Sequence, residues 1–509
     1  MISSINSVSL HGIDGYTVSV ESDVQNGIPI FNMVGLPDAA VKESKERVRV
    51  AIKNSGYDFP LGKILINFAP AHLKKEGSHF DLSIAVGILH NVGSIKDFPS
   101  NEYSFIGELS LNGDIKPIIG VLAMVLSAKK NNIKSIFIPS DNIKEVNFIE
   151  GINIYPCKCL LNVINHLNGE NLITKLTPND IVEDSDYDYN NFSEVKGQTF
   201  AKRACEISAS GNHNIIFIGP PGTGKSLLSR CMPSIIPSLS KQEAIEVNSI
   251  HSITGAFLNS SKILKKIPFR SPHHTSSVTS IIGGGTSPTP GEISLSHLGI
   301  LYLDEIPEFK RDAIEALRDP LETGTVTISR VKGRYIYPCK FLLIASMNPC
   351  KCGFWGYPSP SKSCRCNDFE IKQYLSKISG PIMDRIDLHI SVENIKYKEI
   401  MSPRPEEDSR EILKRVVRCR EIQAERFKGD NIKYNSQMKN THIRKYCNLS
   451  PKSNRFLESA YDTLSLSSRS INKIIKISRT IADLDFSPNI TEDHIAEALQ
   501  YRYLDRNII

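Results

Sequence analysis

The stretch Ile215-Ile-Phe-Ile-Gly-Pro-Pro-Gly-Thr-Gly-Lys-Ser226 decides the fold of this chain. A short apolar run typical of a buried strand leads into a glycine-rich loop, and Leu227-Leu-Ser-Arg-Cys-Met232 follows as the start of a helix. Strand, G-x-x-x-x-G-K-[ST] loop and helix in this order predict a phosphate-binding loop, in which backbone N–H groups and the helix N-terminus face the phosphates. We therefore expect a nucleotide to be bound by Gly219, Pro220, Pro221, Gly222, Thr223, Gly224, Lys225 and Ser226.

A second apolar run, Gly299-Ile-Leu-Tyr-Leu-Asp-Glu305, predicts the strand that completes the site. It ends in two carboxylates, which is the Walker B pattern of ATPases. Lys225 would reach the β- and γ-phosphates, and Ser226 and Asp304 would hold Mg²⁺. Glu305 would act as the general base on the attacking water. The two motifs together predict an α/β P-loop ATPase with ATP and Mg²⁺ as cofactors.

Several longer motifs resemble those of the Mg-chelatase-like AAA+ proteins of the YifB/ComM group. They occur in the family's order and are Phe269-Arg-Ser-Pro-His-His-Thr-Ser-Ser277, Pro290-Gly-Glu-Ile-Ser-Leu-Ser-His-Leu-Gly299, Leu303-Asp-Glu-Ile-Pro-Glu-Phe309, Ser379-Gly-Pro-Ile-Met-Asp-Arg-Ile-Asp-Leu388 and Arg479-Thr-Ile-Ala-Asp-Leu484. The similarity extends over nearly the whole chain. It implies an N-terminal domain, an AAA+ core and a helical C-terminal lid, assembled into a hexameric ring.

The resemblance assigns roles to three further residues. Asn348 ends the apolar run that begins at Phe341 and corresponds to sensor 1, which orients the lytic water. Arg385 corresponds to the arginine finger that serves a neighbouring subunit's nucleotide. Arg469 corresponds to sensor 2 and would touch the γ-phosphate of its own subunit. Each residue also has a plain structural interpretation, as a strand-end turn for Asn348 and as a surface salt bridge for each arginine.

The resemblance also implies a function on DNA. Members of the group are associated with a helicase that drives branch migration in the recombination of transforming DNA during competence. The motif spacings by themselves predict only an ATPase. A Mg-chelatase-type motor for metal insertion, against which the N-terminal domain argues, and an ATP-regulated assembly platform without motor activity are the alternatives.

The domain boundaries follow from composition and periodicity. We expect a linker of acidic and turn-forming residues at 166–195, between an N-terminal domain at 1–165 and the ATPase core at 196–396. Residues 397–509 are expected to form the helical lid. In the lid, helical periodicity predicts helices over 406–428, 451–464, 468–484 and 491–504.

Positive charge gathers in the ATPase core and the lid. The net charge is +6 for the whole chain, but by expected domain it is −1 over 1–165, −6 over 166–195, +8 over 196–396 and +5 over 397–509. This favours a polyanionic partner for the core and lid, although a solvated lysine-rich surface has the same composition.

One segment of the core is a candidate for contact with DNA. Alternating residues around Lys332-Gly333 predict a hairpin. Arg330, Lys332 and Arg334 on this hairpin would contact phosphates without reading the base sequence. An outward-facing basic hairpin with no nucleic-acid role is the alternative.

Residues 1–165 resemble the proteolytic domain of Lon, which has a ribosomal-S5-domain-2-like fold. The resemblance rests on residues 104–140, where we expect strand, turn, strand, helix and strand. His79 then occupies the position of the nucleophilic serine and Leu122 that of the lysine base, while Ser78 is one residue away. Because Leu122 cannot act as a base, we expect no protease activity. An assembly or substrate-guiding collar is the expected role.

Two cysteine pairs, Cys350-Lys-Cys352 and Cys364-Arg-Cys366, lie close together just after Asn348. Four thiolates suit tetrahedral Zn²⁺, although the single residue between paired cysteines is shorter than the two to four that are usual in zinc sites. A reduced, surface-exposed insertion is the alternative.

Eleven cysteines, an odd number, in a 509-residue chain do not suggest a disulfide framework. With no long apolar run and no signal-peptide pattern, the sequence predicts a cytoplasmic protein without membrane contact.

Overall fold

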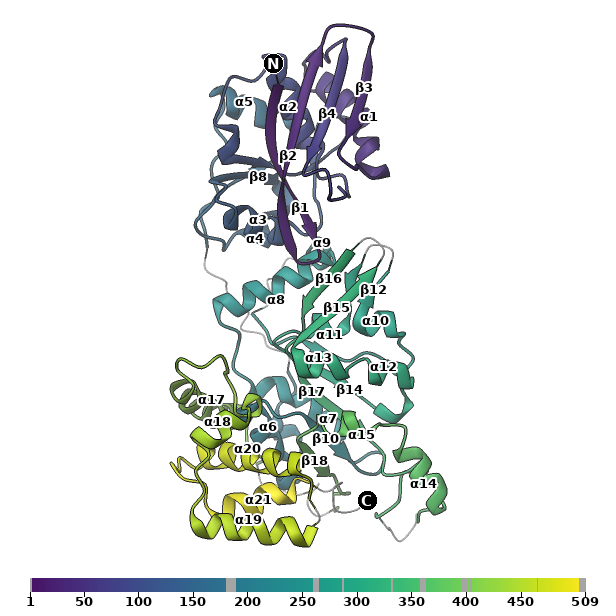
Figure 1. The fold of residues 1–509 in the computed structure, drawn as a ribbon, viewed down its shortest axis with the longest axis vertical. Helices are drawn as coiled ribbons and strands as arrows, with labels where there is room; N and C mark the ends of the chain where they lie inside the picture. The colour runs from purple at the N-terminus through teal and green to yellow at the C-terminus, as the bar shows by residue number, and fades with distance from the viewer. Residues whose placement is uncertain are drawn as a thin grey trace.

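The computed structural model describes residues 2–179, 189–259, 265–285, 288–330, 333–357, 363–395, 397, 401, 405–464 and 466–502. Figure 1 shows an elongated molecule with an N-terminal module at one end and, towards the other end, an ATPase module with a helical C-terminal region beside it. The ATPase module has a parallel central sheet. The α/β fold class predicted from the sequence is confirmed.

The N-terminal module is built on a seven-stranded mixed sheet in the order β3-β4-β2-β1-β5-β8-β9. Ile5 of β1 packs in a core with α1 and α2, whereas Val8 packs in a second core with α3. The strands are β1 (Ile2–His11), β2 (Asp14–Gln25), β3 (Ile30–Val34), β4 (Lys63–Ala69), β5 (Tyr103–Phe105), β8 (Ser135–Pro139) and β9 (Asn153–Cys157). The helices are α1 (Ala39–Asn54), α2 (Asp81–Asn91), α3 (Val121–Lys130), α4 (Ile143–Val146) and α5 (Leu160–Asn168).

Residues 104–140 follow the predicted order of elements. Strand β5 leads to a short hairpin of β6 (Glu108–Leu109) and β7 (Ile115–Lys116), then to α3 and β8. The order of elements implied by the resemblance to the Lon proteolytic domain is therefore found in this part of the module.

The ATPase module contains a five-stranded parallel sheet in the order β11-β14-β17-β10-β18. Its three central strands are buried along their whole length, as is typical of a parallel sheet covered on both faces. They are the strands predicted from the apolar runs. The strands are β10 (Ile215–Ile218), β11 (Phe269–Arg270), β14 (Ile300–Leu303), β17 (Leu342–Met347) and β18 (Leu388–Ser391).

Helices and two small hairpins surround this sheet. The longer helices are α6 (Thr199–Gly211), α7 (Lys225–Cys231), α8 (Lys241–Ile253) and α14 (Asp368–Leu375). The shorter ones are α9 (Ala256–Asn259), α10 (Val278–Ile282), α11 (Glu292–Leu295), α12 (Arg311–Glu315), α13 (Arg318–Thr323) and α15 (Gly380–Met383). The hairpins are β12 (Gly283–Gly284) with β13 (Thr289–Pro290), and β15 (Thr325–Arg330) with β16 (Gly333–Pro338), the second of which was predicted.

The lid shares its hydrophobic core with the ATPase sheet. Val416 of α17 and Ile477 of α20 belong to the same buried cluster as Leu388 of β18. The four predicted helices are found, as α17 (Ser409–Arg426), α19 (Pro451–Leu464), α20 (Ser468–Leu484) and α21 (Glu492–Gln500). A further helix, α18 (Asn440–Tyr446), was not predicted.

A buried polar bridge also joins lid and sheet. His213, just before β10, lies 2.9 Å from the Asp387 carboxylate through Nδ1 and 2.9 Å from Thr480 Oγ1 of α20 through Nε2. Burial opposes ionisation of Asp387, but His213 and Lys473 hold its pKa well below its usual range.

The C-terminal part of the expected linker, residues 189–195, belongs to the ATPase module. Phe192 and Val195 are buried in the core that contains β10 and the lid helices. Residues 180–188 lie outside the described part of the chain.

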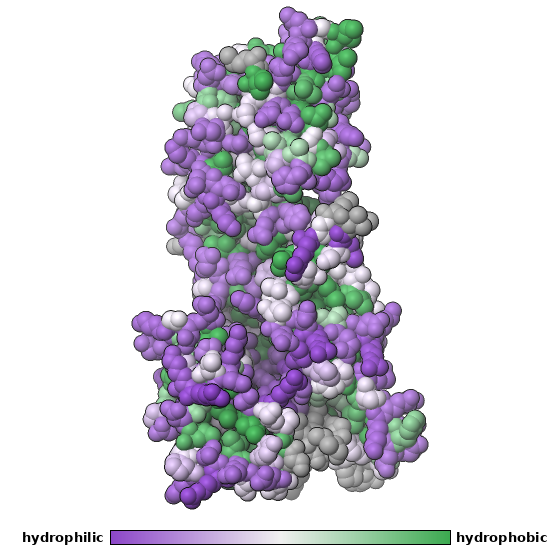
Figure 2. Space-filling view, viewed as in Figure 1, coloured by the Kyte–Doolittle hydropathy of each residue, from purple (hydrophilic) through white to green (hydrophobic). Residues whose placement is uncertain are grey.

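The N-terminal module rests on α8 and on the β15–β16 hairpin (Figure 1). Ser252 of α8 hydrogen-bonds the buried Glu145 carboxylate, and His11 stacks on Tyr335 with 4.4 Å between ring centroids. At the far end, apolar side chains gather at the edge of the sheet near β3 (Figure 2), where Ile28, Ile30, Val34, Leu36 and Leu61 are exposed. Within the described residues, no helix has the length and apolarity needed to cross a membrane.

Candidate ATP-binding and hydrolysis site

The phosphate-binding loop joins β10 to α7 in a backbone conformation that requires glycine. Gly222 and Gly224 have φ of +83° and +89°, and a side chain at either position would point into open space. The Thr223 hydroxyl donates to Pro220 O at 3.0 Å and closes the loop on itself. The loop therefore exposes its backbone where phosphates would bind.

Lys225 lies at the mouth of this loop. Its ammonium donates to the carbonyl oxygens of Gly219 and Pro220, each at 2.7 Å, and to Asn348 Oδ1 at 3.3 Å. Burial lowers the pKa of Lys225 to about 8, against the opposing effect of Asp304 and Glu305. The predicted sensor 1 residue and the loop lysine are thus in direct contact.

The predicted magnesium ligands are also brought together. Ser226 Oγ donates to Asp304 Oδ2 at 3.2 Å. Burial opposes ionisation of Asp304, but hydrogen bonds from Ser346, Tyr302 and Ser226 outweigh it and lower its pKa. An ionised carboxylate beside a hydroxyl oxygen fits the oxygen ligands that Mg²⁺ prefers.

Glu305 follows Asp304 in a strained conformation. Its φ is +51°, in the left-handed region that non-glycine residues rarely adopt. Its side chain is exposed to solvent at the carboxyl edge of the sheet, beside the end of β14. This placement leaves the carboxylate free to face a water near the phosphates.

Ser346 is a site residue that the sequence analysis missed. Its hydroxyl donates to Asp304 Oδ1, accepts from Tyr302 OH at 3.3 Å and accepts from Glu305 N at 3.2 Å. It therefore fixes the Asp304 carboxylate and the backbone of Glu305. The sequence feature that could have identified it is its position as a serine within the otherwise apolar run that ends at Asn348.

Gln198 also supports the loop and was not predicted. Its side-chain amide donates to Thr223 O at 3.4 Å and to Glu393 O at 2.7 Å, so it ties the phosphate-binding loop to the segment after β18. The φ of Gln198 is +54°, and no sequence pattern predicts this backbone conformation at a glutamine.

The two predicted arginines lie at the opposite, amino edge of the sheet. Arg385 precedes β18, donates to Pro381 O at 2.7 Å and pairs with Glu322. Asn214, which precedes β10, donates to Arg385 O at 2.8 Å. The finger candidate is thus at the end of the strands farthest from its own phosphate-binding loop.

Arg469 lies at the same edge. It is 77% exposed and pairs with Asp384 Oδ2 at 3.1 Å, next to Arg385. We expected it to reach the nucleotide of its own subunit, but the structure instead places it with the finger candidate. The physical reason is that α20 begins beside the loop before β18.

The candidate DNA contacts occupy different faces of the β15–β16 hairpin. Arg330 is directly opposite Gly333, whereas Arg334 is opposite Ser329, so the two side chains point to opposite faces. Both are exposed. Lys332 lies outside the described residues.

The candidate zinc ligands converge. The sulfurs of Cys350, Cys352, Cys364 and Cys366 all lie within 4.8 Å of one another. Four thiols in this arrangement could hold a metal ion.

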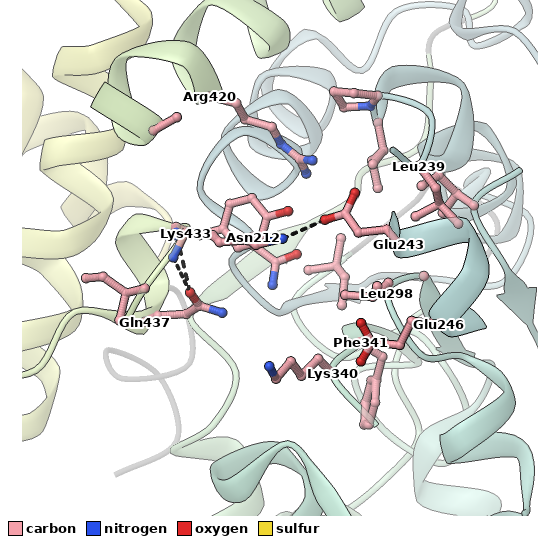
Figure 3. Close-up of a pocket in the computed structure, with 18 of the residues that line it drawn as sticks. Asn212, Leu239, Glu243, Glu246, Leu298, Lys340, Phe341, Arg420, Lys433 and Gln437 are labelled. Carbon is pink, nitrogen blue, oxygen red and sulfur yellow. Dashed lines mark hydrogen bonds and ion pairs between the residues drawn. The ribbon is translucent and has the colours of Figure 1, made fainter. Parts of the chain in front are cut away.

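A separate cleft of about 910 Å³ lies between α8, the lid and the amino ends of β14 and β17 (Figure 3). Figure 3 shows Arg420, Lys433 and Gln437 on one side and Glu243 and Glu246 on the other. Lys433 Nζ lies 2.7 Å from Glu243 Oε1 and joins lid to core. The cleft is at the edge opposite the phosphate-binding loop and is therefore not the nucleotide site.

The Lon-like positions of the N-terminal module are occupied by buried side chains. Burial lowers the pKa of His79 to about 4, and Leu122 is fully buried among apolar residues. The Ser78 hydroxyl donates to the Glu108 carboxylate. The buried Lys75 ammonium donates to Leu73 O at 2.8 Å and to Pro70 O.

Three family models match the chain. The model described as magnesium chelatase, subunit ChlI, matches residues 191–400, and the model of the ChlI C-terminal region matches 406–502. A third, described as subunit ChlI of Mg-chelatase, matches residues 20–142.

The chain is similar along nearly its whole length to two bacterial proteins. It is 38% identical to the competence protein ComM of Haemophilus influenzae over 97% of this chain and 96% of that protein. It is 39% identical to the uncharacterized protein YifB of Escherichia coli over 98% of this chain and 96% of that protein.

The similarity to a chelatase component is more limited. The magnesium-chelatase 38 kDa subunit of Cereibacter sphaeroides is 25% identical over 31% of this chain and 52% of that protein. Together with the family models and the two full-length relatives, these matches show that the chain belongs to the Mg-chelatase-like AAA+ family that includes YifB and ComM.

Proposed function

We propose that this protein is an ATP-driven ring motor that acts on DNA, as a helicase or branch-migration factor in the recombination of transforming DNA. The observation that carries the proposal is the separation of two sets of residues on one sheet. Lys225, Asp304, Glu305 and Asn348 gather at the carboxyl edge, whereas Arg385 and Arg469 lie together at the amino edge. A single chain thus carries one incomplete site at each edge.

This arrangement supports a ring in which each chain completes its neighbour's site. Ser226 and Asp304 would hold Mg²⁺, and Lys225 would bind the phosphate oxygens. Glu305 would take a proton from the attacking water, which Asn348 orients. Arg385 and Arg469 of the adjacent chain would neutralise the charge that develops on the transferred phosphoryl group. A head-to-tail contact of this kind closes into a cyclic assembly, which we propose to be a hexamer.

DNA is the proposed polyanionic partner for two reasons. The full-length relative from Haemophilus influenzae is named a competence protein, and the excess positive charge of this chain lies in the ATPase core and lid. The exposed Arg334 would contact phosphates from the face of the hairpin opposite the one that meets His11. None of the eleven cysteines forms a disulfide, which supports a reducing cytoplasmic location.

The deciding experiment measures ATP turnover without DNA, with single-stranded DNA and with forked DNA. Lys225→Ala supplies the background rate. We expect stimulation by at least one of the two DNAs, and its absence with both would remove the DNA-motor proposal. Stimulation by a tetrapyrrole in place of DNA would favour the chelatase alternative, and nucleotide binding without turnover would favour the assembly platform.

We propose that the N-terminal module acts as a collar and has no protease activity. Leu122 supplies no base, and burial keeps the His79 ring neutral. Degradation of an unfolded casein substrate in the presence of ATP would contradict this assignment.

A further inference from the structure

The four clustered cysteines have the spacing of a mononuclear metal site. The Cys350 and Cys352 sulfurs are 3.3 Å apart, and Cys364 Sγ lies 3.7 Å and 3.6 Å from them. A disulfide would require about 2.05 Å, and the four cysteines are free. Four Zn–S bonds of about 2.3 Å in a tetrahedron place sulfurs about 3.8 Å apart. The observed sulfur spacing is close to that value.

The surroundings of the sulfurs favour bound thiolates. Trp355 N donates to Cys350 Sγ at 3.4 Å. A backbone N–H donor of this kind helps to hold a metal-bound thiolate in place.

The cysteine cluster is attached to the phosphate-binding loop. Cys350 follows two residues after Asn348, which contacts Lys225. At Gly353, where φ is +86°, an added Cβ would lie 2.9 Å from Pro221 Cδ, so this turn packs directly on the loop. A metal that holds the turn would also limit the movement of Pro221.

A second contact lies under the start of the loop. Tyr357 OH donates at 3.2 Å to the carbonyl of Ile218, the residue before Gly219, and it also hydrogen-bonds Ser391 Oγ. The segment from Cys350 to Tyr357 thus touches the loop on its outer side and at its base.

We propose that Cys350, Cys352, Cys364 and Cys366 bind one Zn²⁺ and that this site holds the phosphate-binding loop in position, so that ATP affinity depends on the metal. Loss of the metal would release Cys350 and Cys352 from Cys364 and Cys366. The contacts of Gly353 with Pro221 and of Tyr357 with Ile218 would then loosen. The inference rests on the ATP site of the proposed function and not on DNA, so a failure to find DNA stimulation would leave it intact.

The test measures metal content and nucleotide binding on the full-length protein. Elemental analysis is expected to give about one Zn²⁺ per chain, in line with a four-cysteine structural site. Exchange for Co²⁺ should give the visible absorption of tetrahedral thiolate coordination. The paired variant Cys364→Ser with Cys366→Ser should lose the metal and bind a fluorescent ATP analogue about tenfold more weakly. Cys159→Ser, which changes a partly exposed thiol in the N-terminal module, should retain both properties.

Chelation of the wild-type protein covers the case in which the paired variant fails to fold. We expect removal of the metal to weaken binding of the ATP analogue and readdition of Zn²⁺ to restore it. Absence of zinc from protein purified under reducing conditions, or stoichiometric iron in its place, would overturn the metal assignment. Unchanged ATP affinity after complete removal of zinc would overturn the coupling to the loop.

Discussion

Ser346→Ala should reduce ATP turnover while leaving ATP binding nearly intact. The Ser346 hydroxyl bonds the Asp304 carboxylate, Glu305 N and Tyr302 OH, but none of the groups in the phosphate-binding loop. A hydrogen bond to a charged group contributes about 1.5–3 kcal/mol. If that free energy orients Asp304 and Glu305 in the transition state, its loss lowers kcat by about 10- to 100-fold, since about 1.4 kcal/mol is a factor of ten.

Two further readouts separate positioning from simple destabilisation. Because the Ser346 hydroxyl helps to lower the pKa of Asp304, the variant should need a higher pH to ionise this carboxylate, and the acid limb of its pH–rate profile should move upward. Ser478→Ala is the matched control, because this hydroxyl is also buried but bonds only Ile474 O within α20. It should lose similar stability and keep its turnover.

The assay is steady-state phosphate release with saturating Mg·ATP, together with titration of a fluorescent ATP analogue and a thermal melt for each variant. Turnover of Ser346→Ala within about twofold of wild type, in a folded protein, would refute the reasoning. So would a loss of turnover accompanied by an equal loss in the affinity for ATP.

Three other predictions address the remaining groups of the site. Glu305→Gln should bind the ATP analogue normally and lose phosphate release, and normal hydrolysis would show that this carboxylate is not the base. The pKa of Lys225 is about 8, and bound phosphates would raise it. ATP affinity should therefore be constant below pH 8 and fall by up to about tenfold per pH unit above it. An ATP affinity that does not change with pH would contradict the assignment. Mixing the inactive variants Arg385→Ala and Lys225→Ala should restore some ATP turnover. In a mixed ring, some contacts between neighbouring chains pair an intact phosphate-binding loop with an intact Arg385. If no mixing ratio restores turnover, Arg385 does not belong to a shared site.

The elements that the sequence predicted correctly are those encoded by local patterns. The apolar runs at 215–219, 299–305 and 341–348 became three adjacent buried strands, since a parallel sheet covered on both faces needs continuous apolar strands. The lid helices followed from periodicity, and Thr491 is the N-cap of α21. The short α18 was missed because it is only a few residues long and has no sustained apolar period.

The interactions that were missed depend on contacts between distant segments. Ser346 acquires its partners only because β17 pairs with β14, which brings it beside Asp304. Arg469 meets Asp384 across 85 positions of sequence, a contact set by how α20 packs on the sheet. A family motif could name Arg469 as a sensor, but it could not say which edge of the sheet the side chain would reach.

The common core of sheet and lid has a consequence for how the proposed motor would move. A lid that swings independently needs a thin, polar boundary, whereas α17, α20 and β18 bury one continuous apolar cluster, reinforced by the His213 bridge. Opening that boundary would expose apolar surface at about 25 cal/mol per Å². ATPase module and lid are therefore expected to travel as one rigid block, to unfold in one calorimetric transition, and to convert ATP turnover into rotation of whole subunits against one another.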